Sequence, residues 1–171
     1  GFEPILLPFK PNGKAMHIKG FLARFSKTAK TQAEFLNRIA KLNVPLVGVD
    51  PAIVLSYRDE YKEALGDSRG DFHVLTAHEW LTNQLENNAL QSAVKNIAKS
   101  DRTFEWHLFP HCTESTFMPN SPKEWQHIFA QFGQTLKVEK VGCCGMAGVF
   151  GHEVQNQTMS KDIYDVSWGK K

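Results

Sequence analysis

The chain has 171 residues, of which 42% are apolar and 22% charged, and its 20 basic and 18 acidic side chains give a net charge of +2. This length suits one domain, or two small lobes that share a core. The small net charge excludes a broad electrostatic attraction to nucleic acid or to an anionic membrane. Three cysteines are too few, and odd in number, for a secreted disulfide scaffold, so we expect a reducing, cytoplasmic location. No apolar run approaches the roughly 20 residues that span a bilayer.

In chain order, the first part of the sequence alternates predicted strands and helices. Residues 4–9 form an apolar run that predicts a strand. Apolar side chains recur at spacings of three and four over residues 21–40, which predicts a long helix. Residues 44–49 form a second apolar run and predict a buried strand. Asp50 followed by Pro51 predicts the start of a helix, because aspartate caps helices and proline is tolerated at their first position.

The alternation continues to the end of the chain. After a brief apolar run, residues 76–79 (Thr-Ala-His-Glu) form a capping-box pattern, which predicts a helix start. A second capping box at residues 121–124 (Ser-Pro-Lys-Glu) predicts a helix over residues 125–132. Two further strands are predicted at residues 103–110 and 136–141, and a helical pattern follows the last of them.

Strands that alternate with helices predict an α/β fold of three layers, in which a mostly parallel sheet carries helices on both faces. The two ends of the sequence also echo each other. A strand, a glycine turn and a long helix occur at residues 4–41 and again at residues 136–168. This echo indicates two pseudo-repeated halves.

All three cysteines, Cys112, Cys143 and Cys144, follow the predicted ends of strands, where ligands bind in open α/β sheets. Cys143 and Cys144 open a segment, residues 142–151, that is rich in glycine. We expect this turn to lead into a helix, whose N-terminus favours thiolate over thiol. Three thiolates that converge there would be soft ligands suited to zinc or to an iron–sulfur centre.

Other interpretations of these residues stay open. Each cysteine could be a small core residue, and the glycines could cradle a phosphate, although their spacing fits no phosphate motif. A cysteine nucleophile with His111 or His152 as its base is a third interpretation. His152 and Glu153 could also contact a cluster, or simply begin a solvated helix. The remaining histidines show no metal-ligand spacing, and the aromatic residues follow apolar faces, which argues against nucleic-acid stacking.

Two motifs together resemble a known family. Pro110-His111-Cys112 is followed at residues 143–153 by Cys-Cys-Gly-Met-Ala-Gly-Val-Phe-Gly-His-Glu. This pairing resembles the cysteine-rich CCG domain of heterodisulfide reductases, anaerobic glycerol-3-phosphate dehydrogenases, lactate-utilisation proteins and the iron–sulfur proteins of glycolate oxidase. The longer motif is similar to the C-terminal part of large bacterial flavoenzymes described as D-2-hydroxyglutarate or D-lactate dehydrogenases.

The resemblance implies a division of the chain into two CCG-type halves. Residues 101–171 would be a second copy that holds Cys112, Cys143 and Cys144 and is truncated after Lys171. Residues 1–100 would be a degenerate first copy with connecting helices, in which residues 11–13 (Pro-Asn-Gly) replace Cys-Cys-Gly. Because the sequence begins at Gly1 rather than at methionine, we expect a piece of a longer protein.

The resemblance also implies a function for the parent protein. Its FAD would take a hydride from the α-carbon of a D-2-hydroxy acid, and electrons would pass through iron–sulfur centres to an acceptor. The fragment, inactive by itself, would hold an iron–sulfur cluster or zinc with Cys112, Cys143 and Cys144, or shape the exit route for electrons. Its partners would be the FAD and ferredoxin-like domains of the same chain. The alternative is a structural or docking lobe whose metal site has decayed.

Overall fold

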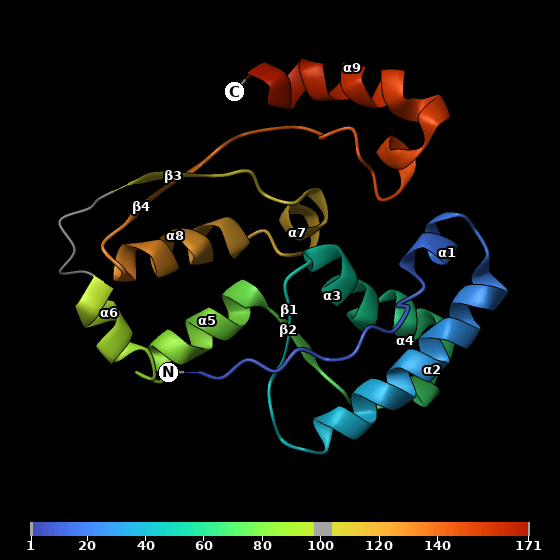
Figure 1. The fold of residues 1–171 in the computed structure, drawn as a ribbon, viewed down its shortest axis with the longest axis horizontal. Helices are drawn as coiled ribbons and strands as arrows, with labels where there is room; N and C mark the ends of the chain where they lie inside the picture. Colours follow the sequence, from blue (N-terminus) through green and yellow to red (C-terminus); the bar gives the residue numbers. More distant parts are fainter. Residues whose placement is uncertain (1, 98–103, 171) are drawn as a thin grey trace.

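The computed structural model describes residues 2–97 and 104–170 (Figure 1). The part before residue 98 contains two strands and several helices, which are α1 (Lys14–Ile18), α2 (Leu22–Ala40), β1 (Leu46–Gly48), α3 (Pro51–Arg58), α4 (Glu60–Leu65), β2 (Val74–Thr76), α5 (Ala77–Glu86) and α6 (Gln91–Ile97). The part after residue 103 contains β3 (Glu105–Leu108), α7 (Cys112–Phe117), α8 (Ser121–Gln131), β4 (Thr135–Val138) and α9 (Gln157–Ser167).

Each part of the described chain carries its own small parallel sheet. β1 pairs with β2, with Leu46 opposite Val74, and β3 pairs with β4, with Glu105 opposite Thr135. The prediction of an α/β fold with parallel strands is therefore confirmed. The three-layer arrangement around one sheet is not seen in residues 2–97 and 104–170, which form two separate two-stranded sheets. Strands of three or four residues, each pair connected through helices, leave little edge along which the two sheets could merge.

The main hydrophobic core lies in the first part and is built around α2. Apolar side chains at helical spacing on α2 face the core, as the sequence pattern predicts, and α2 packs against α1 and α4. Tyr61 and Ala29 are fully buried, and the Tyr61 hydroxyl donates a hydrogen bond of 2.6 Å to the Asn12 carbonyl. The buried residues of this core are Phe25, Ala29, Ala33, Phe35, Leu36, Leu46, Val54, Tyr61, Phe72 and Val74.

The predicted helix starts are confirmed in two cases and changed in one. The Asp50 carboxylate accepts N–H groups of Ala52 and Ile53 at 2.8 and 3.1 Å, so it caps α3 as predicted. The Glu79 carboxylate accepts the Thr76 N–H at 2.8 Å, one half of the predicted capping box. The second predicted box is wrong: α8 already begins at Ser121, whose hydroxyl is used elsewhere.

Residues 4–9 do not form the predicted strand. They run as an extended trace past α5 and toward α1, and no strand of the described chain pairs with them (Figure 1). The two parts of the chain meet through α5 against α8 and α3 against α7. The predicted boundary between residues 100 and 101 lies outside the described residues. Among the described helices, none combines the length and apolar character needed to cross a membrane.

Candidate functional site

Cys112 is the first residue of α7, and its side chain is exposed. The preceding residue, His111, caps this helix, because its Nδ1 accepts the N–H of Thr113 at 3.2 Å. A ring nitrogen engaged with the helix backbone is not directed at the neighbouring thiol. The contacts of His111 therefore support a capping role more than the role of a base for a cysteine nucleophile.

Cys143 and Cys144 lie in the glycine-rich segment that follows β4. Cys143 is exposed and Cys144 half-buried, and the Gly145 N–H donates to the Cys143 sulfur at 3.4 Å. The predicted helix after this turn is present, but its N-terminus does not lie at the cysteines. Two short 3₁₀ turns, η2 (Phe150–His152) and η3 (Val154–Asn156), intervene, and α9 begins only at Gln157. Neither Cys143 nor Cys144 therefore lies at a helix N-terminus.

The glycines of this segment allow it to pack closely on α9. Gly145 has a φ of +83°, and a Cβ at this position would lie 2.1 Å from the Ser160 carbonyl oxygen. The Ser160 hydroxyl donates to the Gly145 carbonyl at 2.9 Å, and Trp168 Nε1 donates to the Gly142 carbonyl at 3.1 Å. Close helix packing thus accounts for these glycines without a phosphate ligand.

The three thiols do not form a complete metal site in the described residues. All three cysteines are unpaired thiols. Within residues 2–97 and 104–170, no group of three or more His, Cys, Asp or Glu side chains is arranged to hold a metal ion. Glu153, which the sequence left as a possible contact of a cluster, instead pairs with Lys19 and accepts the Asn156 side-chain amide. The donor set present therefore does not fit an iron–sulfur cluster or a zinc ion by itself.

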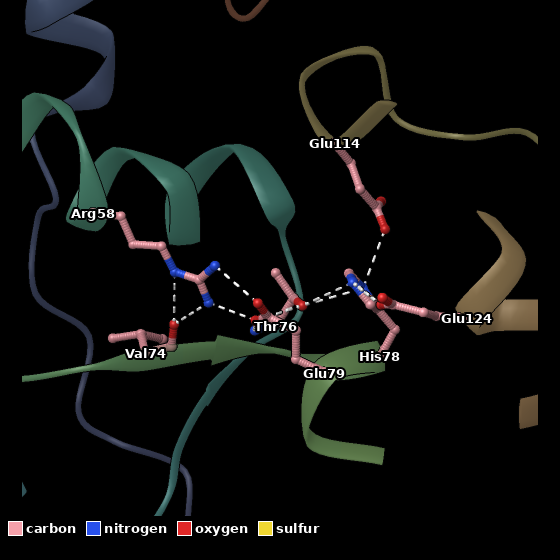
Figure 2. A network of polar contacts seen from close by, with 7 residues as sticks. All are labelled: Arg58, Val74, Thr76, His78, Glu79, Glu114 and Glu124. Atoms are coloured by element: carbon pink, nitrogen blue, oxygen red, sulfur yellow. Dashed lines mark hydrogen bonds and ion pairs between the residues drawn. The ribbon is translucent and has the colours of Figure 1, made fainter. Parts of the chain in front are cut away.

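A buried polar network lies where the two parts of the chain meet (Figure 2). His78, on α5, is 1% exposed, and its Nδ1 lies 3.2 Å from Glu114 of α7. Its Nε2 lies 3.2 Å from Glu124 of α8, and the Thr76 hydroxyl lies 3.1 Å from Nδ1. One imidazole thus contacts carboxylates on two helices from the other part of the chain.

Glu114 is held by more than its contact with His78. The Ser121 hydroxyl donates to its carboxylate at 2.6 Å and the Trp125 indole at 3.3 Å. Burial of the Glu114 carboxyl would raise its pKa, but the hydrogen bonds from His78, Ser121 and Trp125 outweigh burial and lower it. Glu114 is therefore a buried carboxylate that keeps its negative charge at neutral pH.

The same network continues through an arginine on α3. Arg58 donates two hydrogen bonds to Glu79, at 3.0 and 2.5 Å, and two to the Val74 carbonyl, at 3.2 and 2.7 Å (Figure 2). Burial of Glu79 would raise its pKa, but hydrogen bonds from Arg58 and Thr76 and the charge of Arg58 outweigh burial and bring it to about 2. A cavity of about 450 Å³ opens beside Arg58, between α3 and the turn before α8.

This network was missed by the sequence interpretation, which treated His78 as one of several scattered histidines. A local signal was present, because residues 76–79 place Thr, His and Glu at one helix start. The partners Glu114 and Glu124 lie far along the sequence, so only the tertiary structure brings them to His78.

Comparison with known proteins finds similar chains. The chain is 81% identical over all 171 residues to D-2-hydroxyglutarate dehydrogenase of Haemophilus influenzae. It is 56% identical over 168 residues to the Escherichia coli enzyme of that name and 40% identical over 171 residues to that of Pseudomonas putida. The matched segments make up 17%, 16% and 16% of these proteins.

The chain thus spans about a sixth of the length of the curated relatives that it matches. No protein-family model matches the chain, and no solved structure matches it. These matches confirm the predicted resemblance of the chain to part of a D-2-hydroxy acid dehydrogenase.

Proposed function

We propose that this chain is a segment of an enzyme that oxidises D-2-hydroxyglutarate. The observation that carries the proposal is the 81% identity, over every residue of the chain, to a protein of that name. In this reaction the secondary alcohol at C2 becomes a ketone, and two electrons leave the substrate. The resemblance to flavoenzymes suggests FAD as the group that takes them, in a part of the parent protein outside this chain.

Within that enzyme, we propose that the chain is a docking lobe of the CCG type that does not itself turn over substrate. Its packed core and the network around His78 support this role, because they hold the helices of the two parts of the chain together. The described residues also contain no complete set of ligands for a metal. The partners in this proposal are the FAD and ferredoxin-like domains of the same parent chain, in the cytoplasm.

The substrate is tested with the purified full-length parent protein. We expect dye reduction that depends on D-2-hydroxyglutarate, at a rate well above that with D-lactate or with the L enantiomer. Equal rates with D-2-hydroxyglutarate and D-lactate, or no reduction with either acid, would contradict the proposed substrate.

A second candidate role is that Cys112, Cys143 and Cys144 supply ligands to an iron–sulfur cluster or zinc ion completed by residues outside this chain. The observation that favours it is the exposure of Cys112 and Cys143, together with the N–H that Gly145 directs at the Cys143 sulfur. Such an N–H stabilises negative charge on sulfur and is common around thiolate ligands.

The two roles give opposite results for cysteine variants of the full-length protein, purified without oxygen. If the lobe only docks, C112S and C143S keep the iron and zinc content, visible absorbance and turnover of the wild type. If the thiols are ligands, each variant loses metal and absorbance. S115A is the matched control, because Ser115 is exposed on the same helix as Cys112 and is no ligand in either role.

A further inference from the structure

The segment from Pro4 to Lys10 is the most exposed apolar stretch at the start of the chain. Ile5 is 83% exposed, Leu6 95% and Phe9 92%. A protein that leaves three large apolar side chains in one short run open to water creates a surface that favours association. We therefore expect another protein segment to cover this run.

This segment is fixed at both of its ends and is not a loose tail. The ring of Phe2 contacts the ring of Trp80 with their centres 4.8 Å apart, and the Lys10 ammonium lies 5.0 Å from the centre of the Phe35 ring. The carbonyl of Asn12 accepts the buried Tyr61 hydroxyl. The chain between these anchors runs extended across the molecule (Figure 1).

The backbone N–H and C=O groups of this segment are not used in backbone pairing within the described chain. Among the described residues, no backbone–backbone hydrogen bond involves residues 4–10. In an extended chain, alternate N–H groups point to opposite edges. Pro4 and Pro8 fall on one edge and remove two of its donors. The other edge, formed by Ile5, Leu7 and Phe9, keeps every donor and acceptor.

We propose that residues 4–10 form a β-strand that pairs, along the edge of Ile5, Leu7 and Phe9, with a strand from the remainder of the longer parent protein. The occupant follows from length, because the relatives are about six times longer than this chain and their other residues must pack somewhere. This step rests on the proposed function, which makes the chain a segment of such a protein.

The arrangement within the chain itself supports this strand. β4 is also followed by a glycine-containing turn and then by helix, and β4 has a parallel partner, β3. Residues 4–10 precede Gly13, which has a φ of +82°, and then α1 and α2. The segment thus stands in the same order of elements as β4 and lacks the strand that β4 pairs with.

Residue-resolved hydrogen exchange of the full-length parent protein tests this pairing. We expect the amides of Ile5, Leu7 and Phe9 to exchange at least about a hundredfold more slowly than that of Leu6, whose N–H lies on the edge broken by the prolines. Fast exchange of all four amides would overturn the proposal. Equal protection of Leu6 and Leu7 would also overturn it, because one paired edge cannot protect both.

Proline variants of the same full-length protein give a matched pair. L7P removes a donor from the intact edge, and we expect exchange at Ile5 and Phe9 to rise about tenfold or more. L6P removes a donor from the edge that already has two prolines and should leave those amides within about twofold. L6A and L7A control for the lost side chains, and equal effects of L6P and L7P would contradict the one-edge model.

Varying the protein concentration distinguishes a partner strand from the same parent chain from one in a second copy. Protection that disappears on dilution to the monomer would assign the partner strand to a second copy and overturn the proposal. None of these measurements reads activity. A parent protein that fails to oxidise D-2-hydroxyglutarate would refute the proposed function. The exchange pattern would still test the proposed strand pairing independently.

Discussion

At the scale of single residues, Glu79 shows how a half-buried carboxylate stabilises a junction between elements. It lies in the first turn of α5 and binds Arg58 of α3, which in turn binds the carbonyl of Val74 in β2. The low pKa of Glu79, about 2, means that the folded state prefers the charged carboxylate. Its contribution to stability is therefore complete above the ordinary carboxyl pKa and is lost as the pH falls from there toward 2.

We predict that E79Q lowers the free energy of unfolding of the chain by roughly 1–3 kcal/mol at pH 7, because Arg58 loses its charged partner. The difference from wild type should shrink as the pH falls below about 4.5, because the Glu79 carboxyl of the unfolded chain protonates there while the folded carboxylate stays charged until the pH nears 2. Denaturant unfolding followed by circular dichroism at several pH values measures both effects.

The control for this prediction is E86Q, which removes the same charge from an exposed position of the same helix. It should change the free energy of unfolding by less than about 0.5 kcal/mol. A pH-independent loss in E79Q would show that the Arg58 contact does not depend on the charge of Glu79.

Several of these residue-level features could be predicted from sequence, because their cause is local. Asp50 and Glu79 act on N–H groups within three residues of themselves, so a short motif contains all the partners. Ser121 shows where such reasoning ends. Its motif predicts a cap, but a carboxylate seven residues earlier, Glu114, takes its hydroxyl.

At the scale of elements, the glycine-rich segment and α9 depend on each other. The backbone of Gly145 lies so close to the Ser160 carbonyl of α9 that no Cβ fits. The Ser160 hydroxyl also donates a hydrogen bond to the Gly145 carbonyl. The segment that presents Cys143 and Cys144 is therefore positioned by α9 and by Trp168, which follows it.

We predict that G145A loosens this segment much more than G20A does. Both glycines have a φ near +80°, so both substitutions carry the roughly 1–2 kcal/mol strain of an alanine in the left-handed region. Only Gly145 also faces a backbone clash, since nothing lies within 4 Å of a Cβ at Gly20.

Alkylation of Cys143 and Cys144 in the two variants, followed by mass spectrometry, measures this difference. G145A should speed modification of the half-buried Cys144 by about tenfold, and G20A should leave it near the wild-type rate. Equal rates in G145A and G20A would mean that α9 does not hold the segment in place.

At this scale the sequence pattern predicts elements better than their partners. The apolar periodicity of α2 was sufficient because a long helix shows its buried face in its own residues. Residues 4–9 have the composition of a strand, but a strand exists only when another strand pairs with it, and the described chain supplies none. The same limit applies to the cysteines. The strands that precede them, β3 and β4, do pair in parallel in one sheet, but the thiols lie on the segments that follow these strands, and no group of three metal-ligating side chains forms among the described residues.

At the scale of the whole molecule, His78 connects the two parts of the chain. It lies on α5, and its carboxylate partners, Glu114 and Glu124, lie on α7 and α8. Removing the imidazole would leave the buried Glu114 without one of its polarising partners, and an uncompensated buried charge is costly.

We predict that H78A raises hydrogen exchange in α8 by about tenfold or more, while α2 stays within about twofold of wild type. The reason is that α8 loses its polar contact with the first part of the chain, whereas the core around α2 is untouched. H73A is the control, because His73 is exposed and outside the network. Parallel increases in α2 and α8 would show instead that the chain opens only as one unit.

The two small sheets also have a consequence for the order in which the chain folds during synthesis. Each sheet closes a loop of only about thirty residues, from Leu46 to Val74 and from Glu105 to Thr135, and such loops close at a modest entropic cost. The first sheet and the core around α2 are complete once residue 76 has left the ribosome. Glu114 and Glu124 are synthesised later, so we expect them to pack against a His78 that the folded first part of the chain already holds in place.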